Sequence, residues 1–222
     1  MIDGGRRVAV ALRIVTVLAV LVGVGVTAVG ADTLPGLLPY FTIQSNLLLG
    51  CFAAYAALLA RRGGQPPAVV KGAVTTYMVI TGLVYHLVLM NGAGEFSMAD
   101  EAAAASALLQ LGNQLTHTLT PILAVLDWLL LDRSRARFRY ALLWLAYPLA
   151  YLAFALVRGL VTGTYPYPFV DVTELGYGGI AVNTLVFGGA FYLIGLAVVA
   201  ANRAVTRPRR GRGTAPAAGR AD

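Results

Sequence analysis

Two clusters of polar side chains interrupt an otherwise apolar sequence. In the first, Thr42, Ser45 and Asn46 are spaced at i, i+3 and i+4, so a helix places all three on one face. Hydroxyl and amide groups gathered in this way can take part in catalysis. They can also cap the helix or hydrogen-bond to a neighbouring helix within a membrane. The spacing leaves both interpretations open.

The second cluster surrounds a histidine. Gln110, Asn113, Gln114 and His117 follow helical spacing, and Pro121 comes four residues after the histidine. Proline has no N–H group to donate to the His117 carbonyl, and it kinks a helix. We therefore expect a small cavity beside an imidazole, which can accept or donate a proton near neutral pH. A structural histidine that bonds to a neighbouring helix is the alternative interpretation.

The third segment with chemical potential is a loop of prolines and aromatic residues at 165–170, followed by Asp171. Such a loop is stiff, and it predicts a lid that packs over the cavity and carries Asp171 inward. The alternative is a belt of aromatic residues at the membrane interface, where tyrosine and tryptophan are enriched.

The composition shows which elements must position these clusters. Of the 222 residues, 58% are apolar and only 12% are charged, against about 45–50% and about 25% in soluble domains. Because a helix needs about 20 apolar residues to cross a bilayer, we predict an all-α fold, a polytopic bundle of six transmembrane helices. The expected spans are roughly 8–29, 41–60, 73–90, 108–131, 140–160 and 179–201.

The positive residues predict the orientation of this bundle. In the predicted topology, 16 of the 17 lysine and arginine residues fall on the side of both termini, and Arg158 is the exception. Positive residues favour the cytoplasmic side, so we predict cytoplasmic N- and C-termini in the plasma membrane. Residues 1–203 are expected to form the membrane domain. Residues 204–222 are expected to be a disordered basic tail that contacts anionic lipid headgroups and not nucleic acid.

Most polar residues of the spans fall in one layer. Counting from the cytoplasmic boundary at about 1.5 Å per residue places them in the outer half: Thr42, Ser45, Asn46, His86, Asn113 and His117, with Arg158 and Asn183 at the edge. The structural interpretation of Arg158 is that it reaches toward lipid headgroups. Asp127 lies near the cytoplasmic end, where we expect it to pair with arginines of the fourth connection.

Three motifs together resemble a known family. Phe41-Thr42 through Asn46, Asn113 through His117-Thr118 with Pro121, and Tyr167-Pro168-Phe169 occur in this order, and the pattern resembles the bacterial Pr-six-Pr integral membrane proteins. It is also similar to the eukaryotic androgen-induced membrane hydrolases. Those relatives are threonine hydrolases that cleave esters between fatty acids and hydroxy fatty acids. Residues 44–46 depart from the eukaryotic pattern, which leaves the substrate open.

The resemblance implies a lipid-ester hydrolase with a catalytic pair, Thr42 and His117. His117 would take the proton of the Thr42 hydroxyl, which then attacks the ester. Asn46, Asn113 or the Ser45 hydroxyl would stabilise the oxyanion, and Asp171 or a backbone carbonyl would orient His117. The residues predicted to bind the lipid-ester substrate in an outer-leaflet cavity are Ser45, Asn46, His86, Asn113, Arg158 and Asp171.

Two other functions remain open at this point. One is a non-enzymatic protein that binds or transports lipid through the same outer cavity, although we see no inverted repeat or pair of broken helices. The other is a b-type cytochrome with His86 and His117 as axial ligands. For the hydrolase we predict no cofactor and no metal, since two histidines and the single Cys51 are too few for the common zinc sites.

Overall fold

The computed structural model describes residues 2–31, 36–131 and 135–206. These residues form helices and no strand. In chain order the elements are α1 (Ile2–Gly30), α2 (Phe41–Arg61), α3 (Ala68–Val84), η1 (Tyr85–Leu89), α4 (Ala99–Ala104), α5 (Ala107–Gln114), η2 (Leu115–Leu119), α6 (Thr120–Leu131), α7 (Arg139–Leu143), α8 (Ala146–Thr162), η3 (Pro168–Val170) and α9 (Val172–Val205). The elements η1 and η2 are π-helical turns, and η3 is a 3₁₀ turn.

Six helical stretches are long and apolar enough to cross a membrane, which confirms the predicted number of spans. They are Gly4–Gly30, Phe41–Arg61, Ala68–Leu89, Ala107–Leu131, Arg139–Thr162 and Val172–Val205. The sixth begins at Val172 and not near 179, because a short helical segment comes before Gly176. At Gly176 the φ of 64° kinks the helix, which then continues to Val205. Most of the predicted basic tail, residues 207–222, lies outside the described residues.

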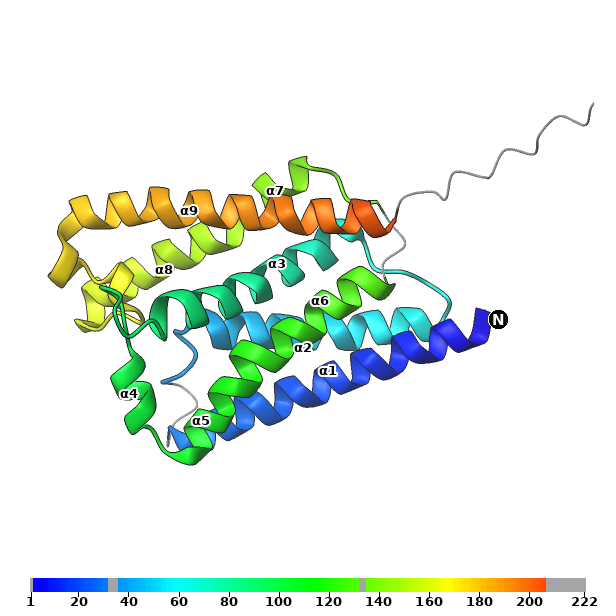
Figure 1. Cartoon of the computed structure of the whole chain (residues 1–222), viewed down its shortest axis with the longest axis horizontal. Helices are drawn as coiled ribbons and strands as arrows, with labels where there is room; N and C mark the ends of the chain where they lie inside the picture. The colour runs from blue at the N-terminus through cyan, green and yellow to red at the C-terminus, as the bar shows by residue number, and fades with distance from the viewer. Residues whose placement is uncertain (1, 32–35, 132–134, 207–222) are drawn as a thin grey trace, which may run out of the picture.

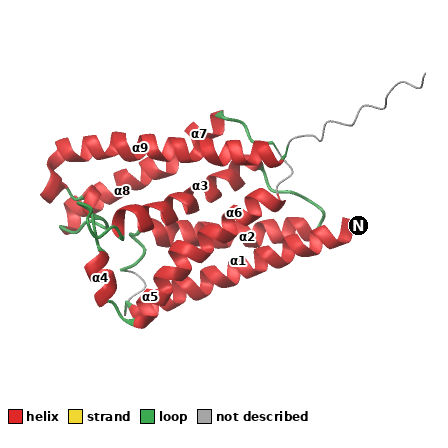
Figure 2. Ribbon diagram, viewed as in Figure 1, coloured by secondary structure: helices red, strands yellow, loops and turns green. Residues whose placement is uncertain are grey.

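The helices lie side by side, with the N-terminus and the end of α9 at one end of the bundle (Figure 1). α1 packs on α2, α5 and α6, while α3 lies centrally and contacts α2, α6 and α9. At the opposite end lie α4 and the loops that precede α4 and α9 (Figure 2). We call this the α4 end. Thr42 follows the first residue of α2, so the bundle presents the first motif there.

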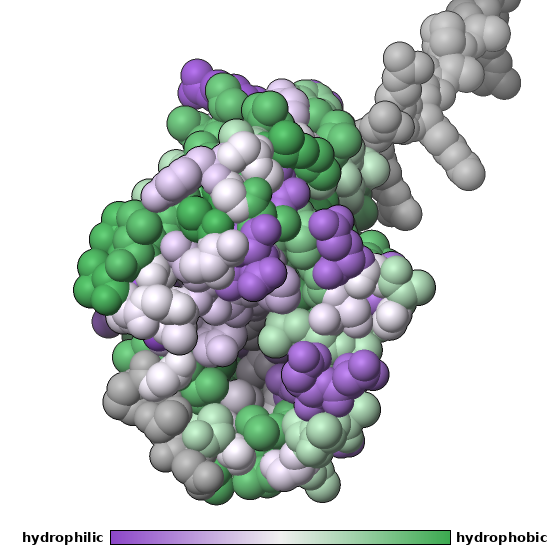
Figure 3. Space-filling model, turned by 90° about the vertical axis from the view of Figure 1, so that its left-hand side faces the viewer, coloured by the Kyte–Doolittle hydropathy of each residue, from purple (hydrophilic) through white to green (hydrophobic). Residues whose placement is uncertain are grey.

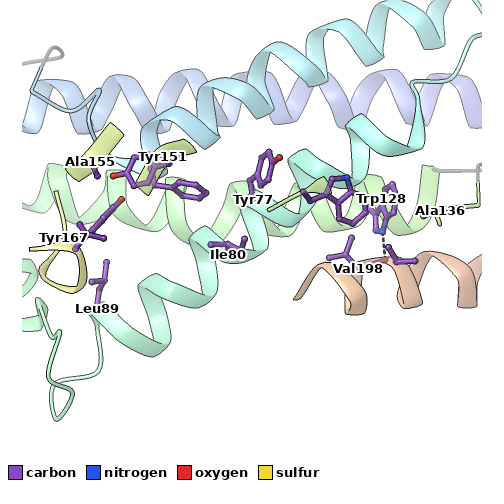
Figure 4. Close-up of a cluster of buried hydrophobic side chains, with 13 residues drawn as sticks. Tyr77, Ile80, Leu89, Trp128, Ala136, Tyr151, Ala155, Tyr167 and Val198 are labelled. Carbon is purple, nitrogen blue, oxygen red and sulfur yellow. Dashed lines mark hydrogen bonds between the residues drawn. The ribbon is translucent and has the colours of Figure 1, made fainter. Parts of the chain in front are cut away.

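An aromatic core runs along the bundle between α3, α6, α8 and α9. It extends from Trp128 and Ala136 toward Tyr151 and Tyr167 at the α4 end (Figure 4). The Trp128 indole donates to the carbonyl of Val198 at 2.9 Å, so the large ring is buried with its one polar atom satisfied. This core fixes the aromatic residues that surround the second and third motifs.

A buried ion cluster joins three helices away from the α4 end. The Asp127 carboxylate accepts from Arg13 Nε at 3.0 Å and lies 3.2 Å from Lys71 Nζ. Both basic side chains are only 1% exposed. The prediction paired Asp127 with arginines of the fourth connection; among the described residues its partners are instead Arg13 and Lys71, and Arg133 lies outside that part of the chain. The partners of Asp127 lie on α1 and α3, because Arg13 and Lys71 belong to the helices themselves and turn inward between them.

Candidate active site

Two side chains from distant parts of the sequence meet at the α4 end of the bundle. The Thr42 hydroxyl oxygen lies 3.0 Å from Nε2 of His117, across 75 residues of sequence. Thr42 is buried in the first turn of α2, and His117 is half-buried in the middle of η2. A hydroxyl and an imidazole at this distance have the geometry of a nucleophile and its general base.

The local backbone explains how His117 reaches Thr42. His117 occupies a π-helical turn, a feature often found at functional sites because it interrupts the regular helical register. Pro121 follows and cannot donate a hydrogen bond to the His117 carbonyl. α3 passes close to that carbonyl, since a Cβ atom on Gly82 would lie 3.2 Å from its oxygen. The sequence predicted a kink next to Pro121, and the structure has this π-helical turn there.

The hydrogen bonds of His117 define its tautomer. Nδ1 lies 3.1 Å from the carbonyl oxygen of Asn113, which can only accept. The Thr116 hydroxyl, 3.2 Å from Nδ1, gives its own proton to the Gly112 carbonyl and so also acts as an acceptor. The ring proton therefore resides on Nδ1, and the lone pair of Nε2 faces Thr42. A backbone carbonyl orients the histidine, one of the two alternatives that the sequence left open.

Tyr167 lies beside the same hydroxyl. Its phenolic oxygen is 3.4 Å from Thr42 Oγ1 and 3.4 Å from the backbone nitrogen of Thr42. Burial raises the pKa of Tyr167 to about 12, so the phenol keeps its proton at neutral pH and can donate it in a hydrogen bond. Tyr167 stacks on Phe169 at 5.1 Å, which holds the loop in place. Membership of the third motif was the only signal in the sequence for this residue.

The first turn of α2 supplies a second donor. The opening N–H groups of a helix have no partner within it, and they form its positive end. Tyr40 caps α2 without a side-chain hydrogen bond, and the Thr42 N–H points to the Tyr167 hydroxyl. A negative charge that develops next to Thr42 would therefore meet both a phenol and a backbone N–H group.

Asn46 holds the pair together and does not face a substrate. Its amide nitrogen donates to the carbonyls of Thr42 and Thr116 at 2.9 and 3.1 Å, and its oxygen accepts from the Thr120 hydroxyl at 2.7 Å. These bonds use both amide protons, so the predicted role of Asn46 in stabilising the oxyanion does not fit. Its position instead aligns α2 with η2. Ser45 is also buried, and neither side chain is among the described residues that line the pockets beside Thr42.

The remaining predicted residues divide between the site and the surface. Asn113 lines a pocket next to His117. His86 is exposed and lies 2.9 Å from the Thr118 hydroxyl, while Arg158 donates to the carbonyl of Thr164 at 2.6 Å. Neither contact involves Thr42. Asp171 caps α9 through its bond to the Thr173 N–H at 2.8 Å, so it is not the group that orients His117.

The two histidines do not present a site for haem. The Tyr85 ring stacks on His117 with centroids 4.0 Å apart, and it meets His86 edge-on at 4.9 Å. Both ring nitrogens of His117 have partners within the protein. A haem between two axial histidines needs one ring nitrogen of each to point at the iron, and this donor set does not fit that requirement.

Two pockets meet at the Thr42–His117 pair. The first, which we call the apolar pocket, encloses about 450 Å³ of empty space including its mouth and is lined mainly by apolar and aromatic side chains of α2, α3, α8 and α9. The second encloses about 940 Å³ between α1, α2, α4 and α5; most of its lining is apolar, and we call it the polar pocket because Glu101 and Asn113 also line it. Thr42, His117 and Tyr167 line both pockets.

The polar pocket lies at the α4 end of the bundle. Figure 3 looks onto this end, where hydrophilic and intermediate residues gather over the middle and hydrophobic residues lie along the sides. A neighbouring pocket of about 960 Å³ shares Tyr40, Met98 and Tyr167 with the polar pocket. Three carboxylates line this neighbouring pocket, on Glu95, Asp171 and Glu174. Acidic groups therefore lie on the approach to Thr42 from this end, although most of the polar pocket's own lining is apolar.

We compared the chain with models of protein families, with curated proteins and with solved structures, and none of them matches. The likeness to the Pr-six-Pr proteins therefore stays a prediction. Any function assigned to the chain depends on the geometry of Thr42, His117 and Tyr167.

Proposed function

We propose that the protein is a membrane-embedded hydrolase of lipid esters, with Thr42 as nucleophile and His117 as general base. One observation carries the proposal: Thr42 Oγ1 lies 3.0 Å from Nε2 of a histidine whose proton is held on Nδ1. This is the protonation state that a general base needs. The resemblance to threonine hydrolases implies the same two residues.

The reaction can be written with its protons. His117 Nε2 takes the Thr42 proton as Oγ1 attacks the ester carbonyl, and the oxyanion accepts hydrogen bonds from Tyr167 and the Thr42 N–H. The resulting imidazolium gives the proton to the departing alcohol, which leaves an acyl-threonine. Water then attacks this ester with His117 again as base. The products are a fatty acid and a free threonine hydroxyl.

The charges around the site favour a neutral substrate. The polar pocket contains Glu101, and the pocket beside it contains three further carboxylates. No lysine or arginine is among the described residues that line either of them or the apolar pocket. Esters of hydroxy fatty acids carry a free carboxylate, so a neutral acyl ester suits this chain better than the substrates of the enzymes it resembles.

The location follows from the charge distribution. We propose that both termini are cytoplasmic and that the α4 end faces the outer side of the plasma membrane. Arg6, Arg61 and Arg62 lie on elements at the opposite end, where they suit anionic lipid headgroups. In this orientation the Thr42–His117 pair belongs to the outer leaflet.

Tyr167→Phe is expected to lower kcat on the order of 10²-fold and to change KM little. The substitution removes a donor to the oxyanion and keeps the ring stacked on Phe169. The measurement is steady-state hydrolysis of p-nitrophenyl palmitate by protein in phosphatidylcholine nanodiscs. Tyr165→Phe, in the same loop, is the matched control and should behave as wild type. An equal loss in both variants would mean that the phenol acts only through the structure of the loop.

The proposal itself is tested by hydrolysis of that neutral ester with purified wild type and Thr42→Ala. We expect turnover by wild type and none above background by the variant. Thr76→Ala, another buried helical threonine, bonds only within its own helix at 2.8 Å and should retain activity. Equal turnover in wild type and Thr42→Ala contradicts the proposal. Lipid binding without turnover, unaffected by the substitution, would instead support the non-enzymatic alternative.

A further inference from the structure

The apolar pocket has a neighbour between two of the candidate spans. A further pocket, enclosing about 600 Å³ with its mouth, lies between α8 and α9. It shares four lining residues with the apolar pocket: Pro148, Tyr151, Phe169 and Phe191. Its residues from Leu145, just before α8, to Leu152 belong to the fifth candidate span, and its α9 residues, from Ile180 to Phe191, belong to the sixth. The space between these spans therefore borders the apolar pocket, which contains Thr42.

We propose that this space is a lateral entrance through which the acyl chain of the substrate reaches Thr42 directly from the bilayer. The inference rests on the proposed function and names its substrate class: esters with a long acyl chain, embedded in the membrane. The chain would lie between α8 and α9 and in the apolar pocket. The ester carbonyl would lie at Thr42, and the alcohol part would lie in the polar pocket.

The chemistry of the lining fits an acyl chain. Only three described residues of the α8–α9 pocket carry a polar side-chain group, and each of them donates one hydrogen bond within the protein. Asn183 donates to the Phe169 carbonyl at 3.0 Å, and the Thr184 hydroxyl donates to the Ile180 carbonyl at 2.7 Å. The Tyr151 hydroxyl donates to the Pro39 carbonyl at 2.9 Å. The surface left for a ligand is therefore mainly apolar, which favours hydrocarbon over water.

Phe169 connects this entrance to the catalytic pair. Its ring stacks on Tyr167 at 5.1 Å and lies 4.8 Å from the ring of Phe187 on α9. The Asn183 side chain fixes the backbone of Phe169 against α9. A chain that follows this row of rings from α9 arrives at Tyr167, whose hydroxyl lies beside Thr42. The stiff loop between α8 and α9 therefore forms one wall of the path.

Two adjacent glycines of α9 offer a matched test. A side chain at Gly188 or at Gly189 would begin in open space, with no atom within 4 Å of its Cβ. Only Gly188 is among the described residues that line the α8–α9 pocket. Gly188→Trp should therefore fill the entrance without disturbing the packing, whereas Gly189→Trp adds the same ring outside the pocket.

The first measurement compares two esters with the same leaving group in phosphatidylcholine nanodiscs. Gly188→Trp is expected to slow hydrolysis of p-nitrophenyl palmitate about tenfold or more. Hydrolysis of p-nitrophenyl acetate, which has no chain to place between α8 and α9, should change less than about twofold. Gly189→Trp should leave both rates unchanged. An unchanged palmitate rate in Gly188→Trp, or an equal loss for both esters, overturns the lateral entrance.

A second measurement does not depend on turnover, so it separates this inference from the proposed function. A palmitoyl ester with a photoreactive diazirine within a few carbons of the ester carbonyl is incorporated into the same nanodiscs and irradiated. We expect labelled Tyr151, which is only 7% exposed, in wild type, Thr42→Ala and Gly189→Trp. Gly188→Trp should lose this label. Labelling of lipid-facing residues alone, such as Leu185, or of α1 and α4 in place of α8, overturns the inference even if hydrolysis is confirmed.

Discussion

Replacing His117 with alanine is expected to lower kcat for p-nitrophenyl palmitate by about 10³-fold, within the range typical for loss of a general base. The reason is that no other described ring nitrogen lies within hydrogen-bonding distance of the Thr42 hydroxyl. KM should change little, since His117 Nε2 binds the nucleophile and not the substrate. Added imidazole should restore part of the rate, because it can occupy the vacated space beside Tyr85 and accept the proton.

His86 provides the matched control for this experiment. It occupies the other π-helical turn, η1, and its ring nitrogen lies 2.9 Å from a threonine hydroxyl, that of Thr118. His86→Ala removes the same side chain from the same kind of turn, and its rate should stay within about twofold of wild type. Equal losses in the two variants, with no rescue by imidazole in either, would show that the histidines act through structure and not through proton transfer.

Replacing Asp127 with alanine is expected to lower the free energy of unfolding by about 3–5 kcal/mol. The change removes the carboxylate that Arg13 and Lys71 share while both side chains remain 1% exposed. Leaving buried cations without their counter-ion costs far more than losing a surface ion pair. The measurement is equilibrium unfolding of the purified protein in detergent micelles, followed by circular dichroism.

Two further variants test whether the loss of stability in Asp127→Ala comes from the unpaired cations. Asp100→Ala, at an exposed position in α4, should change the unfolding free energy by less than about 0.5 kcal/mol. The triple variant Arg13→Leu, Lys71→Met, Asp127→Leu should recover most of the stability, because apolar side chains can replace a buried ion cluster. A loss below about 1 kcal/mol for Asp127→Ala would contradict the ion cluster as a determinant of stability.

The spans could be predicted because bilayer crossing depends on local composition. Each segment must be long and apolar by itself, and that property can be counted along the chain. The prediction failed for charged side chains whose position depends on neighbouring helices. Arg13 and Lys71 were counted with the basic segments at the membrane boundary, whereas the fold turns both toward Asp127 between the helices. A sequence count cannot separate a lysine that faces water from one that a neighbouring helix neutralises.

The sequence predicted which residues form the site better than it predicted what each of them does. Counting along each helix placed Thr42 and His117 in the same layer, but their contact requires η2 to lie against α2, which no local pattern encodes. The same limit applies to Tyr167, which is 125 residues from Thr42. Asn46 was predicted from its spacing, yet its amide bonds to backbone carbonyls and aligns two helices. Hydrogen-bond partners, and not residue types, distinguish a residue that binds substrate from one that positions the nucleophile.

The most direct measurement of the central claim is the site of covalent acylation. Wild-type protein in nanodiscs is mixed with excess p-nitrophenyl palmitate, quenched with acid during the first turnover and digested for mass spectrometry. The proposed mechanism predicts a palmitoyl ester on Thr42, absent from the same peptide of His117→Ala. Release of p-nitrophenol with no acyl group on Thr42, or with the acyl group on another residue such as Cys51, would contradict it.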